Sequence, residues 1–106
     1  MYTKISRYMV QPEKKEEFLD IQQEISDLYL NSMGGRMQFL RNENNSEEWI
    51  VLQQFESRDL FDRRIHEVLE NLAETDLEDR LRDLLTAPVE ENTQDYYMFM
   101  EVISED

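Results

Sequence analysis

The sequence predicts an α+β fold in which four antiparallel strands form one sheet that helices cover. Three observations indicate it: runs rich in β-branched and aromatic residues, apolar residues that recur every three or four positions between those runs, and the order in which the segments alternate. The length of 106 residues suits a single domain over 1–106. The hydrophobic fraction of 40% is slightly low for a globular chain, but eleven aromatic residues and many Leu, Ile and Val argue against disorder.

The first strand is predicted over residues 2–10, where β-branched and aromatic side chains are frequent. It stops before Pro12, which is tolerated at a helix start because the N–H that proline lacks would have no partner there. The helix that follows should end at Gly34, since glycine accepts the left-handed conformation of a C-terminal cap. Its apolar stripe is Phe18, Ile21, Ile25, Leu28 and Tyr29.

Two further strands, 36–41 and 48–55, are predicted to form a hairpin around the turn-rich segment 42–46. Ser57 is placed to cap the next helix, and Asp59 suits the positive end of that helix's dipole. A second amphipathic helix is therefore expected after the hairpin. Its apolar positions are Phe61, Ile65, Val68, Leu69 and Leu72.

A short third helix is predicted to begin at a capping box formed by Thr75 and Glu78, and Pro88 blocks its continuation. The last strand is predicted over 94–103. The resulting order, β-α-β-β-α-(α)-β, is that of ferredoxin-like folds with a four-stranded antiparallel sheet. The apolar face of the third helix is expected to hold Leu77, Leu81, Leu84 and Leu85.

Two of the predicted strands carry apolar residues on both faces. In strand 48–55, Trp49, Val51 and Phe55 point one way, and Ile50 and Leu52 point the other. The chain's own helices cover one face, and a second open apolar face would exceed the patches that monomers tolerate. We therefore expect a homodimer through the open sheet face. The last strand would add Tyr96, Met98, Met100 and Val102 on one face and Tyr97, Phe99 and Ile103 on the other.

The composition excludes several kinds of site. Without cysteine there is no disulfide, no Cys-based zinc site and no thiol nucleophile, and one histidine cannot build a site that needs two. The 25 acidic and 11 basic residues give a net charge of −14, so neither nucleic acid nor an anionic membrane is expected as a partner. The N-terminal residues lack the apolar stretch of a secretion signal, so a cytoplasmic protein is expected.

The element order, Pro12 at the first helix and the segment WIVLQQFESRDLF over 49–61 resemble the dimeric α/β-barrel superfamily, and within it the antibiotic biosynthesis monooxygenase (ABM) domain. In that segment an aromatic-rich strand leads into a serine-capped helix. The resemblance covers essentially the whole chain and implies a homodimeric barrel with a pocket in each subunit. It also implies oxidation of a planar hydrophobic or phenolic small molecule without a tightly bound metal. No cofactor is expected, with haem and flavin left open.

The haem-degrading branch of this superfamily uses residues that the chain lacks. Its first-strand asparagine falls on Ser6, its tryptophan on Arg64 and its haem-ligating histidine on Glu74. The comparison argues against haem degradation, unless His66 supplies the ligand from a shifted register.

His66 stands four residues from both Asp62 and Glu70, so the three share one helical ridge. This spacing fits an imidazole oriented by a carboxylate for acid–base catalysis, or a metal site with two carboxylates. It fits an exposed helix face with i,i+4 pairs as well, which is the commoner arrangement.

Tyr8 and Arg64 join His66 as candidate catalytic residues. A buried phenol such as that of Tyr8 is suited to hold a substrate hydroxyl. Arg64 stands beside the apolar stripe, where it would neutralise an anionic substrate or pair with Glu67. Core packing is the alternative for the candidate substrate-binding residues, Trp49, Phe61, Tyr97 and Met98.

Two functions remain open from the sequence. One is an ABM-like monooxygenase, and the other is a non-catalytic dimer, a small-ligand-binding or stress-related α/β-barrel protein. The two glycines are adjacent and form no phosphate loop, and no spacing suggests a Ser-His-Asp triad. Nucleotide-dependent and hydrolytic chemistry are therefore poor alternatives.

Overall fold

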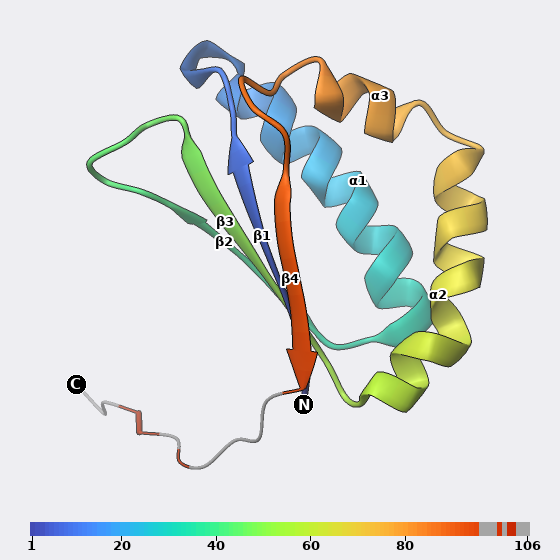
Figure 1. Ribbon diagram of the computed structural model, residues 1–106. Helices are drawn as coiled ribbons and strands as arrows, with labels where there is room; N and C mark the ends of the chain where they lie inside the picture. The colour runs from blue at the N-terminus through green and yellow to red at the C-terminus, as the bar shows by residue number, and fades with distance from the viewer. Residues whose placement is uncertain (96–99, 101, 104–106) are drawn as a thin grey trace.

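The computed structural model describes residues 1–95, 100 and 102–103, and it shows one antiparallel sheet with the helices on one side (Figure 1). The strands lie in the order β2-β3-β1-β4. The predicted α+β class and ferredoxin-like element order are confirmed. In chain order the elements are β1 (Tyr2–Met9), the 3₁₀ turn η1 (Pro12–Lys14), α1 (Lys15–Met33), β2 (Arg36–Arg41), β3 (Glu48–Phe55), α2 (Arg58–Ala73), α3 (Leu77–Arg82) and β4 (Glu90–Asp95).

Helix α1 begins after a short 3₁₀ turn, and not directly at Pro12. Pro12 opens that turn, and the α-helical hydrogen bonds start at Lys15. Gly34 ends the helix as predicted, with a φ of 67°, and its N–H donates to the carbonyl of Leu30 at 2.8 Å. The predicted stripe packs into the core through Phe18, Ile21, Ile25 and Tyr29, with Leu28 half-buried beside them.

The β2–β3 hairpin forms as predicted, and side chains of its turn hold it together. The Oδ1 of Asn42 accepts from the N–H of Asn44 at 2.8 Å. Gly35, just before β2, has a φ of 93°, and a Cβ there would lie 2.3 Å from the backbone oxygen of Gln54. A side chain at this position would therefore push the two strands apart.

Ser57 caps α2 as predicted, since its Oγ accepts from the N–H of Leu60 at 3.1 Å. The capping box predicted for α3 is wrong. The hydroxyl of Thr75 donates to the carbonyl of Leu72 at 2.7 Å and so closes the end of α2, and it accepts from the N–H of Leu77 at 3.3 Å. Helix α3 then begins at Leu77, and it ends at Arg82, before the last two predicted leucines.

The last strand begins earlier than predicted, because β4 spans Glu90–Asp95, whereas the predicted strand begins at residue 94. Its register explains the difference. β4 pairs with β1 from Arg7 opposite Glu90 to Tyr2 opposite Asp95, so β1 offers no further strand backbone beyond that point. Residues 96–99 lie outside the described part, while Met100, Val102 and Ile103 are exposed and belong to no strand.

The two sides of the sheet differ in what they contact. In β3, Trp49, Val51 and Phe55 are buried on the helix side, called the inner face, while Ile50 and Leu52 are half-buried on the other side, called the outer face. This confirms the alternation predicted for β3. β4 is polar and exposed along its whole length, so the apolar part of the outer face is narrower than the sequence predicts.

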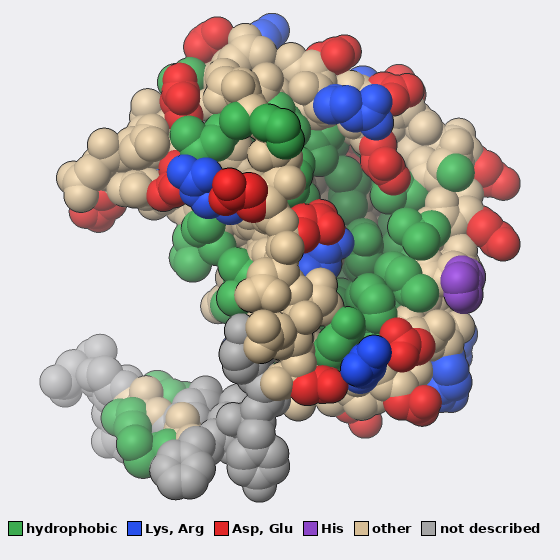
Figure 2. All heavy atoms as spheres, in the orientation of Figure 1, with side chains coloured by type: hydrophobic (Ala, Val, Ile, Leu, Met, Phe, Trp, Pro, Cys, Tyr) green, Lys and Arg blue, Asp and Glu red, His purple; other side chains and the backbone are tan. Residues whose placement is uncertain are grey.

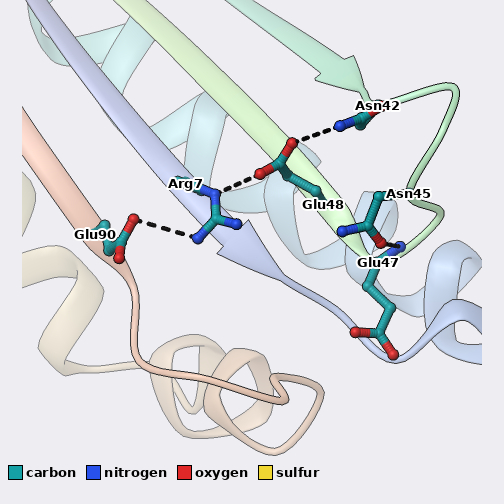
Figure 3. Close-up of polar contacts among 6 residues, drawn as sticks. All are labelled: Arg7, Asn42, Asn45, Glu47, Glu48 and Glu90. Carbon is teal, nitrogen blue, oxygen red and sulfur yellow. Dashed lines mark hydrogen bonds and ion pairs between the residues drawn. The ribbon is translucent and has the colours of Figure 1, made fainter.

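A network around Arg7 occupies the polar part of the outer face (Figure 3). Arg7 Nε donates to Glu48, and Nη1 donates to Glu90 at 3.3 Å. Asn42 Nδ2 donates to the other oxygen of Glu48 at 2.8 Å. The bonds from Asn42 and Arg7 lower the pKa of Glu48, and the bond to Glu48 raises the pKa of Arg7. The network links β1 to the strands on both sides of it.

None of the helices in the described part of the chain combines the length and the apolar composition needed to cross a membrane. The cytoplasmic location expected from the sequence stays a prediction.

Candidate functional site

A cavity of about 310 Å³ lies between the inner face of the sheet and the helices, and all four strands and all three α-helices contribute to its lining. Figure 2 shows hydrophobic side chains in a hollow between β4 and the helices, with basic and acidic side chains at its edge. A volume of this size suits a small organic molecule.

The sheet places four polar side chains in the lining of the cavity. Lys4 and Tyr8 are four residues apart on β1, and this even separation turns both side chains to the inner face. Gln53 stands directly opposite Lys4 on β3, and Glu91 reaches the cavity from β4. Three neighbouring strands thus place an ammonium, a phenol, an amide and a carboxylate in one wall.

The helices supply the opposite wall, where aliphatic side chains lie beside the polar side chains of Gln22, Glu78 and Arg82. Ile25 from α1, Leu72 from α2 and Leu81 from α3 are buried side chains of this wall, and Leu69 is 46% exposed beside them. Aliphatic groups facing a polar wall suit a ligand with a flat hydrocarbon body and one polar edge.

Lys4 is the charged centre of the polar wall. Its side chain is 17% exposed, and Nζ lies 3.4 Å from Glu91 and 5.7 Å from the centre of the Tyr29 ring. Burial works to lower the pKa of Lys4, but the phenol of Tyr29, the carboxylate of Glu91 and the phenol of Tyr8 outweigh it and raise the pKa. The ammonium therefore stays charged at neutral pH.

Tyr8 lies between this ammonium and α1. Its ring packs edge-on against Phe18 with the ring centres 5.6 Å apart. Burial raises the pKa of Tyr8, and the opposing influences of the Gln22 side chain and the Lys4 charge are weaker. The phenol is therefore protonated at neutral pH and can donate a hydrogen bond to a ligand.

Gln22 brings an unpaired donor to the cavity. The residue is 2% exposed, and its Nε2 has no hydrogen-bond partner among the described residues. The amide of Gln53 differs, because its Nε2 donates to Met37 Sδ at 3.6 Å. Burying an unsatisfied donor costs about 1–3 kcal/mol. In the wall of a cavity, such a group marks a place where a ligand atom can accept the missing bond.

Of the three candidate catalytic residues, Tyr8 lines the cavity, whereas Arg64 and His66 are exposed on α2 and do not. Arg64 Nη1 lies 3.8 Å from Glu67, which is the surface pairing considered from the sequence. Asp62, expected on a ridge with His66, lies 3.6 Å from Arg58. Within the described residues, no group of three or more His, Asp or Glu side chains is arranged to hold a metal ion.

Trp49 and Phe61, candidate substrate-binding residues, belong to the aromatic core beside the cavity. The ring of Trp49 has its centre 5.2 Å from that of Phe18, and the ring of Phe61 lies 5.1 Å from that of Phe55. Neither residue contributes to the cavity lining. Their contacts match the core-packing alternative, and a contribution to binding would have to act through their neighbours.

Tyr97 and Met98, the remaining candidates, lie outside the described residues. Sequence reasoning missed Lys4, Gln22 and Glu91. Lys4 gave a signal in its even spacing from Tyr8, and Gln22 gave one as a polar residue next to the apolar stripe of α1. Glu91 gave none, because the last strand was predicted to begin after it.

The residues of the cavity do not fit haem. The single histidine of the chain, His66, is exposed on α2 and outside the lining. Ser6 is buried in β1 and 1% exposed, and Glu74 is exposed at the end of α2. Ser6 and Glu74 are, with Arg64, the three positions where the chain differs from the haem-degrading branch. Since His66 lies outside the cavity, the structure offers no histidine ligand for haem there.

Comparisons with known proteins show that other proteins share this fold. The sequence profile of the family described as antibiotic biosynthesis monooxygenase (ABM) matches residues 1–66. The comparison with curated protein sequences finds no match. The structure of SnoaB, a cofactor-independent oxygenase from Streptomyces nogalater, is 18% identical, with a TM-score of 0.69 over 93% of this chain and 95% of that one.

Two other solved structures share the fold at a similarly low sequence identity. A candidate antibiotic biosynthesis monooxygenase from Nitrosomonas europaea is 15% identical, with a TM-score of 0.71 over 92% of this chain and 100% of that one. A conserved protein from Methanosarcina mazei is 18% identical, with a TM-score of 0.69 over 88% of this chain and 89% of that one. At these identities the likeness shows a shared fold.

The profile match runs from β1 into α2 and includes Lys4, Tyr8 and Gln22. The cavity residues of α3 and β4, and those in the second half of α2, follow it in the chain. Because the match spans residues 1–66 of 106, more than half of the sequence, the chain belongs to the antibiotic biosynthesis monooxygenase family.

Proposed function

We propose that this protein is a monooxygenase that oxidises a planar hydrophobic or phenolic small molecule in the cavity, without a tightly bound metal. The observation that carries the proposal is a cavity, in a member of the ABM family, that combines polar side chains of the sheet with aliphatic side chains of the helices. The shared fold of SnoaB, described as a cofactor-independent oxygenase, supports the same class of chemistry.

The proposed reaction needs an electron-rich substrate that the protein holds and helps to deprotonate. One atom of O₂ enters the aromatic ring as a carbonyl oxygen, and the other leaves as water with the two hydrogens that the phenol loses. The substrate supplies the electrons, so no external reductant enters the balance. Tyr8 and Lys4 are the groups of the polar wall that would hold the substrate hydroxyl.

The test is oxidation of 1-naphthol by the purified protein under O₂. We expect oxygen uptake with formation of 1,4-naphthoquinone, and a kcat/KM at least about tenfold lower for Tyr8→Phe, which loses the phenol hydroxyl. Arg63→Ala is the control, because Arg63 is exposed and pairs with Asp59 on α2 at 3.3 Å. Absence of uptake and of quinone across a panel of naphthols and phenols would contradict the proposal.

The catalytic roles predicted for Arg64 and His66 are tested in the same assay. Both residues are exposed on α2, so a role would require them to reach the substrate from outside the cavity. A lower kcat for Arg64→Ala or His66→Ala at unchanged Tm would support that role. Unchanged kinetics would remove both residues from the mechanism.

The second candidate function is binding without turnover, as a dimeric small-ligand-binding or stress-related protein. The position of Arg64 and His66 outside the cavity favours it, because it leaves Tyr8 as the one candidate catalytic residue in the lining. This function predicts saturable binding of naphthols with no quinone formed. The monooxygenase predicts both.

We also propose that two copies pair through the outer face as a homodimeric α/β barrel. Ile5 stands opposite Leu52, and Leu40 stands opposite Ile50, so apolar side chains of β1, β3 and β2 lie together on this face. Leu40 is 54% exposed in the single chain. A second copy would cover these side chains as the helices cover the inner face.

A further inference from the structure

We propose that Lys4 and Gln22 together form a receptor for an ionised hydroxyl oxygen, so that the cavity binds a hydroxyaromatic ligand as its anion. The inference rests on the proposed function in taking the cavity as the substrate site, and it adds the chemical form in which the ligand is bound. It assigns the selection of that form to two residues, one on β1 and one on α1.

Gln22 is the directional hydrogen-bond donor of the proposed receptor. Its Nε2 is buried in the cavity wall and makes no well-formed hydrogen bond among the described residues, and of its two N–H donors at most one can point to the nearby phenol of Tyr8, so the other needs an acceptor. A ligand oxygen meets this need, whereas a methyl group or an ammonium does not. The ligand should therefore present an acceptor at this wall.

Lys4 provides the positive charge on the sheet side of the cavity, whereas on the helix side the cation Arg82 and the anion Glu78 of α3 line it together. Glu91 and the Tyr29 ring occupy part of its surroundings, at 3.4 Å and 5.7 Å from Nζ. An ammonium has three N–H donors, so hydrogen-bonding capacity is left for a ligand. With 17% of its side chain exposed, the charge acts in a partly desolvated site, where it favours an anion more than it would in water.

Tyr8 shows that the two groups act on one region. The Gln22 side chain lies close enough to the Tyr8 phenol to lower its pKa by hydrogen bonding, and the positive charge of Lys4 lowers the same pKa. A ligand hydroxyl placed next to Tyr8 would meet the same amide and the same ammonium. Tyr8, which burial keeps protonated, would donate a further hydrogen bond to the anion.

Glu91 sets the balance of charge before the ligand arrives. Its carboxylate neutralises Lys4 in the free protein, and its side chain is 48% exposed, so water reaches it. When a neutral hydroxyl enters and ionises, its proton passes to the Glu91 carboxylate and from there to solvent. The oxygen keeps the electron pair of the broken O–H bond and takes the place of Glu91 beside the ammonium.

The experiment is a spectroscopic titration of the native protein with 4-nitrophenol, whose neutral and ionised forms absorb at different wavelengths. We expect the bound probe to ionise at a lower pH than the free probe, by about one pH unit, which corresponds to about tenfold preference for the anion. 4-Nitroanisole, which has no hydroxyl to ionise, should bind at least about tenfold more weakly.

Three variants with matched controls assign the effect to its groups. Lys4→Met should abolish the preference for the anion and Gln22→Leu should reduce it, while Glu91→Gln should enlarge it because the competing negative charge is gone. The controls are Arg63→Ala, Gln23→Leu and Glu70→Gln, which make comparable changes at exposed positions. A preference that persists in Lys4→Met, or one that the controls alter equally, overturns the proposal.

Folding and turnover are separated from the binding result. If Lys4→Met does not fold by circular dichroism, Lys4→Gln and Gln22→Leu carry the test. Quinone formation without any preference for the anion would overturn this inference and leave the monooxygenase standing. A preference for the anion without turnover would do the reverse.

Discussion

Lys4 and Arg7 are two cations three residues apart on β1, and they face opposite sides of the sheet. On the outer face, Arg7 contacts Glu48 and Glu90, one on each neighbouring strand, and Asn42 completes the bonding of Glu48. On the inner face, Lys4 has one carboxylate, Glu91, and lies in a cavity.

The difference between these two sites shows how one strand separates architecture from ligand binding. Because side chains alternate along a strand, an odd spacing sends two cations to opposite faces. The outer cation joins three strands in a network that needs no further partner. The inner side is incomplete, since the Gln22 amide near the same cavity wall lacks an acceptor among the described residues.

The largest expected effect is on turnover, and it tests whether Lys4 serves the ligand and Arg7 serves the fold. Lys4→Met should lower kcat/KM for naphthol oxidation by about 100-fold, because the anion would lose its cationic partner, while Arg7→Met should change it by less than about twofold. Kinetics well below the Tm of each variant provide the measurement. Equal losses in the two variants would mean that the faces are not functionally distinct.

The next effect concerns the outer face. Leu52→Asp should weaken dimerisation by at least about tenfold, because it puts a charge among the apolar side chains that a second copy would cover. The net charge of a dimer would be 2 × −14 = −28, so dimerisation should strengthen or stay level as salt rises. Gln23→Asp, at an exposed site on α1, is the control in light scattering. A monomeric native protein at micromolar concentration contradicts this prediction.

A smaller effect, on the free energy of unfolding, is expected from a substitution in the cavity wall. Gln22→Leu should increase the free energy of unfolding by about 1 kcal/mol, because it removes a buried donor without a partner. Gln23→Leu, on the exposed side of the same helix, should leave it nearly unchanged. Urea denaturation measures both. Destabilisation by Gln22→Leu would indicate that the amide serves the fold and not a ligand.

The smallest effect is a pH dependence of the outer network. The pKa of Glu48 lies below its ordinary value of 4.5, so its stabilising contribution is present above pH 4.5 and is lost as the pH falls through the lowered pKa. Glu48→Gln should therefore lose less stability than the native protein on acidification below pH 4.5. Thermal unfolding at a series of pH values checks it, with Glu70→Gln as the control. Parallel curves for native protein and Glu48→Gln would contradict the assignment.

Most of the fold could be predicted from short-range patterns in the sequence. The cap at Ser57, the end of α1 at Gly34 and the two-sided alternation of β3 are set by neighbouring residues, and each was found as predicted. β4 was misplaced because its position depends on pairing with β1 over Tyr2–Arg7, a contact between the two ends of the domain. Its polar residues carry no strand signal of their own.

The site was less predictable than the fold because its residues come together only through contacts between distant parts of the chain. Tyr8 was found because a phenol on a buried strand is conspicuous, and it lines the cavity. Arg64 and His66 were attractive as functional groups, but exposure depends on how α2 is rotated against the core, and single residue types do not reveal that. Lys4 and Gln22 become a pair only after β1 and α1 pack together.

The acidic character of β4 also bears on how copies of the protein can associate. An edge strand presents unpaired backbone groups that invite another chain to extend the sheet. β4 is exposed and carries Glu90, Glu91 and Asp95, so a second copy that approached with its own β4 edge would bring the same negative charges against them. Electrostatic repulsion between like edges thus disfavours the pairing of two β4 strands, so a symmetric pair of copies would have to meet through another surface, such as the proposed outer face.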